Sequence, residues 1–261
     1  MLNKKIISVV NQKGGVGKTT SAINFAASLV LHHKKKVLVI DFDPQGNAST
    51  GLGLAVNERV HSVYDVMLGD CEINEAIFKT KITGLFLIPA IVDLSAAEIE
   101  LSEIEDREFI LKSKINEIID NFDYIIIDCP PSLGLLTVNA LSSTDYILIP
   151  MQCEFYSLEG LSHLLTTLEL IKKNLNPDLN ILGIILTMHD KRNKLTEQVE
   201  DDVRKFLGDL VFKSCIPRNV RLSEAPSYGE VALTYDPKCA GSKAYIELSE
   251  EVVKLMSTPF N

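Results

Sequence analysis

Six short, nearly uninterrupted apolar runs constrain the fold of this 261-residue chain more than any other feature. They occupy residues 5–10, 36–41, 84–89, 124–129, 146–150 and 181–188. Strands that lack polar alternation are typical of a parallel sheet whose two faces are both covered by helices. Between the runs, the sequence predicts helices that include residues 18–33, 108–121, 156–174 and 194–207. We therefore expect an α/β fold with a doubly wound, mostly parallel sheet flanked by helices.

The composition limits the functions that such a fold can have. With 46% hydrophobic residues the chain can bury a large core, and we expect a single domain over residues 1–261. The five cysteines are scattered without a C-x-x-C pair, which argues against a disulfide framework or a zinc site and favours a reducing cytoplasm. No stretch approaches the roughly 20 apolar residues that span a bilayer, and no secretion signal is expected. The formal charge of −9 means that any DNA binding needs a local basic patch.

A glycine-rich loop, NQKGGVGKTT at residues 11–20, stands between the first predicted strand and the first predicted helix. Its glycines allow backbone N–H groups to converge on phosphate oxygens at the start of the helix. In this context Lys18 reaches the β and γ phosphates, the Thr19 hydroxyl ligates Mg²⁺, and Thr20 holds the α-phosphate. The residues expected to contact the nucleotide here are Lys13, Gly14, Gly15, Val16, Gly17, Lys18, Thr19 and Thr20. The loop predicts a P-loop NTPase with ATP and Mg²⁺ as cofactors.

The loop departs from the usual G-x-x-x-x-G-K-[ST] pattern, because Gln12 replaces the first glycine and a second lysine, Lys13, precedes Lys18. This K-G-G-V-G-K-T-T sequence resembles the deviant Walker A motif of a family that includes the ParA/Soj partition ATPases, MinD and the nitrogenase iron protein. The resemblance implies that Lys13 reaches across a dimer interface, where a cation stabilises the charge of γ-phosphoryl transfer. A homodimer would then form only around ATP. The simpler interpretation is a solvated loop lysine.

Three aspartates end predicted strands, at the edge where open α/β folds bind ligands. Asp41 and Asp43 lie in VLVIDFDPQGNAST, and Asp128 lies in YIIIDCPPSLG. The D-x-D-P-Q-G-N stretch resembles the partition ATPases, which implies that Asp43 positions or polarises the attacking water and that Asp41 is a supporting carboxylate. Local turn formation in DPQG would also explain Asp43. Asp128 is typical of a Walker B aspartate, which accepts a hydrogen bond from Mg²⁺-bound water.

Two other segments give structural expectations only. Residues 93–108 hold seven acidic residues against one arginine, and we interpret them as a solvated helical face without chemistry. The segment 241–256 predicts a last amphipathic helix. Its apolar face is expected to consist of Ala244, Leu248, Val252 and Leu255.

Residues 191–221 contain eight basic and five acidic residues, a reversal of the chain's overall sign that is consistent with contacts to DNA phosphates. The stretch CIPRNVRLSEAPSYGEVALTYDPKCAGSKAY resembles the C-terminal signature of the ParA/Soj partition ATPases. The resemblance implies that Pro217 and Asn219 border the adenine and that Arg192 and Arg221 bind DNA nonspecifically. The further basic residues expected to help are Arg218, Lys191 and Lys194. An ion pair of Arg221 with Glu224 is the structural alternative.

Together the motifs resemble the ParA/Soj family from one end of the chain to the other. This family implies a cytoplasmic, nucleoid-associated ATPase with weak intrinsic turnover. Its ATP dimer binds double-stranded DNA, and a ParB/Spo0J-type centromere-binding partner stimulates hydrolysis. A MinD-like membrane-associated ATPase is an alternative, although the acidic ending ELSEEVVKLMSTPFN does not suit anionic lipid. An iron protein is disfavoured because Cys129 lacks a companion cysteine. A regulator of replication initiation or transcription stays open, as does the choice of chromosome or plasmid as cargo.

Overall fold

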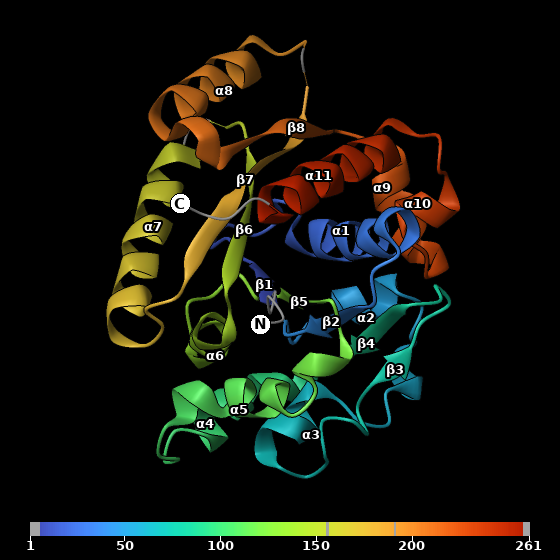
Figure 1. Ribbon diagram of the computed structural model, residues 1–261, viewed down its shortest axis with the longest axis vertical. Helices are drawn as coiled ribbons and strands as arrows, with labels where there is room; N and C mark the ends of the chain where they lie inside the picture. Colours follow the sequence, from blue (N-terminus) through green and yellow to red (C-terminus); the bar gives the residue numbers. More distant parts are fainter. Residues whose placement is uncertain (1–5, 155–156, 191, 258–261) are drawn as a thin grey trace.

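The computed structural model describes residues 6–154, 157–190 and 192–257, which fold around one eight-stranded sheet (Figure 1). The strand order across the sheet is β3-β4-β2-β5-β1-β6-β7-β8. The strands are β1 Ile6–Val9, β2 Val37–Asp41, β3 Phe78–Lys79, β4 Leu85–Ile88, β5 Tyr124–Asp128, β6 Tyr146–Gln152, β7 Asn180–His189 and β8 Val211–Pro217. Every neighbouring pair is parallel except β3 with β4, at one edge of the sheet. The predicted doubly wound α/β fold is confirmed.

Helices cover both faces of the sheet. The α-helices are α1 Lys18–His33, α2 Asn47–Gly51, α3 Val63–Leu68, α4 Ala97–Glu100, α5 Ile110–Asn116, α6 Leu135–Ser143, α7 Ser157–Asn174, α8 Lys194–Leu207, α9 Val220–Glu224, α10 Ala232–Tyr235 and α11 Ala240–Ser257. One core joins the sheet to α1 and α11, which lie side by side in Figure 1, and the other joins it to α3, α5, α6, α7 and α8. Within the described residues, no helix is long and apolar enough to cross a membrane.

The two cores explain why the predicted strands lack polar alternation. In β2, Leu38 and Ile40 pack into the core that contains α5 and α6, whereas Val37 and Val39 pack beneath α1. Each buried aliphatic side chain stabilises the fold by about 1.5–3 kcal/mol, so both sets of side chains hold the strand in its register. This register brings the carboxyl ends of the central strands to one edge of the sheet, where the candidate site lies.

Several expectations from the sequence need correction. The edge strand β8 was not predicted, because Lys213 is exposed and interrupts its apolar run. The predicted helix 108–121 is shorter, since only α5 is α-helical there and short 3₁₀ turns flank it. In α11, Leu255 is 39% exposed and Met256 takes the buried position that was assigned to it. The burial pattern of β8 and the exposure of Leu255 depend on the neighbours that cover each side chain. The spacing of apolar residues along the chain does not predict those neighbours.

The acidic segment 93–108 is not one continuous helix. It contains a 3₁₀ turn at Val92–Ser95, the short helix α4 and a second 3₁₀ turn at Arg107–Phe109. Glu98 in α4 accepts a 3.4 Å hydrogen bond from the backbone N–H of Leu136, in the first turn of α6. A carboxylate there favours the helix N-terminus, so part of this segment supports the loop that follows β5.

Candidate nucleotide site and basic surface

The glycine-rich loop joins β1 to α1 and depends on backbone conformations that favour glycine. Gly15 has a φ of +75° and Gly17, at the N-cap of α1, has a φ of +88°. Side chains with a Cβ rarely adopt this left-handed region, so glycine is required for the tight entry into the helix. The first turn of α1 contains no acidic residue that would oppose a bound anion. The loop therefore has the geometry of a phosphate site at a helix N-terminus.

Two side chains from neighbouring strands hold the loop in place. The Thr187 hydroxyl, from β7, donates a 2.7 Å hydrogen bond to the carbonyl oxygen of Val16. The Gln152 amide, at the end of β6, donates to the carbonyl oxygen of Gly15 at 3.0 Å. These supporting residues were missed from the sequence. One sequence feature could have indicated them, since each is a polar residue near the carboxyl end of a parallel strand.

The two lysines of the loop differ in their surroundings. Lys18 is only 7% exposed, and its Nζ donates to the carbonyl oxygen of Lys13 at 3.1 Å. Burial lowers the pKa of Lys18, while the nearby charges of Asp128 and Asp43 oppose that change. The side chain of Lys13 is 44% exposed and forms an ion pair with Glu154, which follows β6. One lysine thus lies inside the site and the other at its surface, where another molecule can contact it.

Two buried aspartates end neighbouring strands. Asp41 in β2 and Asp128 in β5 are partners in the parallel register, and both side chains are fully buried. Burial raises the pKa of Asp41 to about 6, against hydrogen bonds from the Ser49 N–H and hydroxyl at 2.7 and 2.6 Å. Burial, followed by the charge of Asp41, raises the pKa of Asp128 well above its usual range. This pair places two buried carboxyl groups beside Lys18 of the phosphate loop, where holding both negative charges without a compensating cation is costly.

Three buried carboxylate oxygens near the loop have the chemistry that Mg²⁺ requires. Among the described residues, both carboxylate oxygens of Asp128 and Oδ1 of Asp41 are buried without a hydrogen-bond partner. The Thr19 hydroxyl lowers the pKa of Asp128 as a hydrogen-bonding neighbour, although its contact falls outside standard hydrogen-bond geometry, and the charge of Lys18 lowers this pKa as well. Water molecules on a hydrated Mg²⁺ would donate to these oxygens, and the ion itself would compensate their charge. The residues therefore fit a magnesium ion held between Thr19 and Asp128.

Asp43 occupies the turn after β2 and is 8% exposed. Its Oδ1 accepts the Gln45 N–H at 3.0 Å, and its carbonyl oxygen accepts the Gly46 N–H at 2.9 Å. The predicted turn role is therefore present. Asp43 also raises the pKa of Lys18 by its charge, so it lies near the phosphate loop as well. The turn geometry holds this carboxylate at the site rather than excluding it from chemistry.

A cavity of 140 Å³ lies beside the start of α1. Its lining residues are Gly17, Thr20, Thr187, Met188, Ile216, Pro217, Arg218, Asn219, Leu222, Ser223 and Tyr245. Pro217 and Asn219 therefore share one cavity with Gly17 and Thr20 of the phosphate loop, and their contact with the adenine stays a prediction. Asn219 is also the N-cap of α9, since its side chain accepts the Arg221 N–H at 2.9 Å. Tyr245, from α11, is a cavity residue that the sequence did not indicate.

The predicted basic residues lie on the loops and helix starts that follow β7 and β8. Arg192 is 90% exposed and donates through Nε and Nη2 to the Asp190 carboxylate, both at 2.9 Å. These bonds lower the pKa of Asp190 to about 2. Arg221 is 49% exposed and pairs with Glu224 at 2.7 Å, and its Nε lies 3.4 Å from Asp236. The ion pair that was the alternative interpretation of Arg221 is thus present.

The remaining basic candidates are placed less uniformly. Arg218 and Arg192 both line a hollow of 720 Å³ beside β8. Lys194 is exposed at the first position of α8. Lys191 lies outside the described residues. Because β7 and β8 are parallel neighbours, their following loops meet at one edge, and four of the five predicted basic residues are there.

A phosphate loop with a buried lysine, next to two buried aspartates at the carboxyl ends of parallel strands, defines a P-loop nucleotide site of the deviant Walker A class. A family model described as an AAA domain matches residues 4–181. The chain is 50% identical over 251 residues to the chromosome partitioning protein ParA of Caulobacter vibrioides, covering 95% of this chain and 94% of that protein. The chain belongs to the ParA/Soj family of chromosome-partitioning ATPases.

Two further similarities support this assignment. The sporulation initiation inhibitor protein Soj of Bacillus subtilis is 50% identical over 248 residues, which cover 95% of this chain and 98% of that protein. Among solved structures, cobyrinic acid a,c-diamide synthase from Mycobacterium smegmatis, with a bound ATP analog and magnesium, has a TM-score of 0.85 at 34% identity. This match covers 98% of our chain and 96% of that chain. The family predicted from the sequence is confirmed.

Proposed function

We propose that this chain, as one domain over residues 1–261, is an ATP-driven switch for DNA partition. Mg-ATP binding produces a homodimer, and the dimer binds double-stranded DNA without sequence preference. Hydrolysis is weak in the isolated protein, and stimulation by a ParB/Spo0J-type partner resets the switch. Relatives that are described as chromosome partitioning proteins support this proposal. We place the protein in the cytoplasm, on the nucleoid and not on a membrane.

The observation that carries the proposal is the group of unpartnered carboxylate oxygens beside Lys18 and Thr19. Lys18 binds the β and γ phosphates, and the backbone N–H groups of the loop surround them. Thr19 would hold Mg²⁺ directly, Asp128 would hold it through water, and Asp41 would support that carboxylate. Magnesium neutralises the phosphate charge when it is bound. Asp43 orients the attacking water from the turn after β2.

Lys13 is suited to act on a second subunit because its present partner holds it weakly. An ion pair between exposed groups such as Lys13 and Glu154 contributes about 0–1 kcal/mol. A triphosphate carries several negative charges and accepts stronger, charge-assisted hydrogen bonds. Contact with ATP in a partner subunit would therefore replace Glu154. Dimerisation then depends on the nucleotide that supplies those charges.

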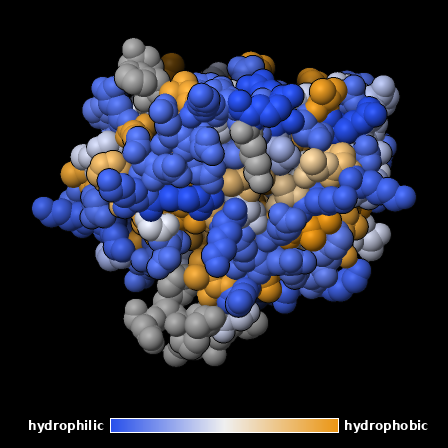
Figure 2. All heavy atoms as spheres, turned by 90° about the horizontal axis from the view of Figure 1, so that it is seen from above, coloured by the Kyte–Doolittle hydropathy of each residue, from blue (hydrophilic) through white to orange (hydrophobic). Residues whose placement is uncertain are grey.

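The arginines at the ends of β7 and β8 are suited to DNA phosphates for a similar reason. Arg192 and Arg221 are paired with exposed carboxylates, and phosphate oxygens can replace these partners at low energetic cost. Arg218 and Lys194 add positive charge on the same loops and helix start, and Lys191 precedes Arg192 in the sequence. Figure 2 shows the end of the molecule that carries α8, where hydrophilic residues predominate over separate hydrophobic groups. The positive charge that suits a phosphate backbone comes from Arg192, Arg218 and Arg221 on the loops and helix starts after β7 and β8.

Binding of Asp43→Ala protein to a nonspecific DNA duplex, with ATP or ADP over a salt series, tests the proposal. We expect binding with ATP only, and an affinity that falls as salt rises. Arg221→Glu in the same background should reduce the salt slope by about 1 to 2 and weaken binding. Lys173→Glu is the matched control, because Lys173 is exposed near the C-terminus of α7, before the start of β7.

Three results would contradict the proposal. Equal binding with ATP and ADP would remove the nucleotide switch. Equal loss in Lys173→Glu and Arg221→Glu would show that only net charge matters. Absence of DNA binding in every state, together with ATP-dependent binding to anionic liposomes, would favour the membrane alternative.

A further inference from the structure

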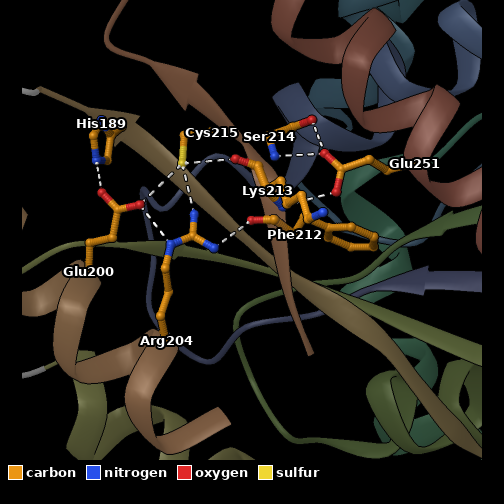
Figure 3. A network of polar contacts seen from close by, with 8 residues as sticks. All are labelled: His189, Glu200, Arg204, Phe212, Lys213, Ser214, Cys215 and Glu251. Atoms are coloured by element: carbon orange, nitrogen blue, oxygen red, sulfur yellow. Dashed lines mark hydrogen bonds and ion pairs between the residues drawn. The ribbon is translucent and has the colours of Figure 1, made fainter. Parts of the chain in front are cut away.

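Three potential metal ligands from three elements converge near the carboxyl end of β7, outside the nucleotide site (Figure 3). They are His189 in β7, Glu200 in α8 and Cys215 in β8. His189 Nε2 lies 2.6 Å from Glu200 Oε2, and Cys215 Sγ lies 3.9 Å from Glu200 Oε1. The ligating atoms of all three residues lie within 4.8 Å of one another. None of the three has a role in the proposed ATPase.

We propose that His189, Glu200 and Cys215 bind a thiophilic divalent cation of the zinc type. Imidazole nitrogen, carboxylate oxygen and thiolate sulfur are the ligands that zinc uses in proteins. Tetrahedral coordination at normal bond lengths separates such ligand atoms by about 3.3–3.7 Å. The separation of 2.6 Å between His189 Nε2 and Glu200 Oε2 would have to widen to this spacing when the cation binds. The lack of a C-x-x-C pair argued against a zinc site. This cluster was missed because the three ligands are far apart in the sequence, at residues 189, 200 and 215.

Arg204 is compatible with this site although it lies next to it. Its guanidinium donates to Glu200 Oε1 at 2.8 Å and to the carbonyl oxygen of Phe212 at 3.1 Å, and Nη2 lies 3.5 Å from Cys215 Sγ. The cation would bind through Oε2, the oxygen now shared with His189, so Arg204 keeps its bond to Oε1. Outer hydrogen bonds of this kind orient metal ligands, and a neighbouring cation favours the thiolate.

The proton balance follows from the ligands. The hydrogen-bonding proton between His189 Nε2 and Glu200 Oε2 would be released to solvent when the cation binds, and Nε2 would then bind the cation as a neutral imidazole nitrogen. Cys215 binds as thiolate and releases its proton to solvent. Glu251 of α11 contacts β8 independently of this cluster, because it accepts a hydrogen bond from the backbone N–H of Ser214 at 2.7 Å (Figure 3). The site can therefore adjust on the α8 side without breaking that contact.

The fourth coordination position has space. His189, Glu200 and Cys215 line the hollow of 720 Å³, which is also lined by the acidic residues Asp190 and Glu247 and by the basic residues Arg192, Lys213, Arg218 and Lys243. Water can occupy the open position, as in zinc sites with three protein ligands. A bound cation would tie α8 to β7 and β8. Arg192 and Arg218 line the same hollow, so this connection would stiffen the basic surface.

Competition between metal-free protein and a chromophoric zinc chelator tests this site. The full chain is stripped with EDTA and saturated with Mg-ADP, so that the nucleotide site cannot account for zinc binding. We expect one equivalent of Zn²⁺ to be taken from the chelator. Cys215→Ser and His189→Gln should each weaken this binding by about 100-fold or more, because each removes a direct ligand. Cys239→Ser is the matched control, since that thiol bonds Ser242 at the start of α11 instead.

Cobalt provides an independent measurement on the unsubstituted chain. Co²⁺ bound to the thiolate should give a sulfur-to-cobalt charge-transfer band that disappears with Zn²⁺ and is missing in Cys215→Ser. Failure of the chain to compete with the chelator would overturn the proposal. So would zinc affinity that survives both ligand substitutions, or a cobalt spectrum without the thiolate band. If a variant does not fold, the cobalt spectrum of the unsubstituted chain decides the question.

Discussion

The aspartates beside the phosphate loop are buried, whereas the arginines beyond β7 and β8 are exposed to solvent. Asp41 and Asp128 have 0% exposure, so their charges depend entirely on nearby groups. Arg192 is 90% exposed, and water screens its ion pair. Solvent cannot compensate for the loss of a buried charge, whereas each solvated charge contributes a small and nearly additive amount of free energy. The first region should therefore respond to substitution almost completely, and the second in increments.

Asp43 should give the largest effect and is the sharpest test of the buried region. Asparagine at this position keeps an oxygen acceptor for the Gln45 N–H, so the turn survives while the charge is lost. We expect Asp43→Asn to slow hydrolysis about 100-fold or more while ATP still binds. Single-turnover phosphate release and fluorescent-nucleotide binding measure the two properties. Hydrolysis at the unsubstituted rate would leave Asp43 with its turn role alone.

Lys13 joins the two kinds of region, since it is exposed in the monomer and proposed to be buried in the dimer. Lys13→Gln should weaken the dimer formed with a non-hydrolysable ATP analogue by at least about 30-fold, because a contact to buried phosphate is lost. Sedimentation velocity measures the dimer. Glu154→Gln is the companion variant, and it should dimerise at equal or lower protein concentration because it releases Lys13. A full-strength dimer in Lys13→Gln would refute the trans role.

The buried region should also make stability depend on pH. The pKa of Asp41 is about 6 in the folded chain, above the value of about 4 in an unfolded one. The folded chain therefore holds an extra proton between these values, and the free energy of unfolding falls as pH rises from about 4 to 6. Above pH 6 it stays at the lower level.

Asp41→Asn removes this charge but keeps an acceptor for Ser49. We expect the nucleotide-free variant to gain about 1–3 kcal/mol of stability at pH 7. Its pH slope should flatten in part, because the raised pKa of Asp128 still contributes. Urea unfolding at several pH values measures both effects, with the exposed Asp120→Asn as control. A destabilised variant with an unchanged slope would show that Asp41 is not the source.

The smallest effect is expected at the basic surface, where the comparison predicts increments. Glu224→Gln removes a partner of Arg221 while Asp236 stays nearby. Nonspecific DNA should then bind about two- to fivefold more tightly at low salt, since an exposed ion pair contributes little. Fluorescence anisotropy with the ATP-bound Asp43→Ala background measures this change. A gain much above tenfold would mean that the ion pair controls DNA binding, and the contrast between the regions would fail.

The predictions from sequence succeeded where a local pattern has one structural solution. The helices α1 and α8 have the predicted bounds, because strong turn or capping signals precede them at Gly17 and Asn193. The phosphate loop was placed correctly for the same reason. The prediction failed at β8, Leu255 and the acidic segment, where the covering neighbours are distant in sequence. The residues 152 and 187, which hold the loop, were missed because no local motif marks them.

Sequence by itself determined the ATPase family, the doubly wound sheet and the position of the glycine-rich loop, because glycine conformation, apolar strands and charged loop positions act over short distances. Only the tertiary structure decided which charges are buried and which partners they have. It placed Asp41 beside Asp128, paired Lys13 with Glu154 and brought His189, Glu200 and Cys215 together. These outcomes depend on desolvation and on contacts between distant strands and helices, which are properties of the packed chain and not of any short segment.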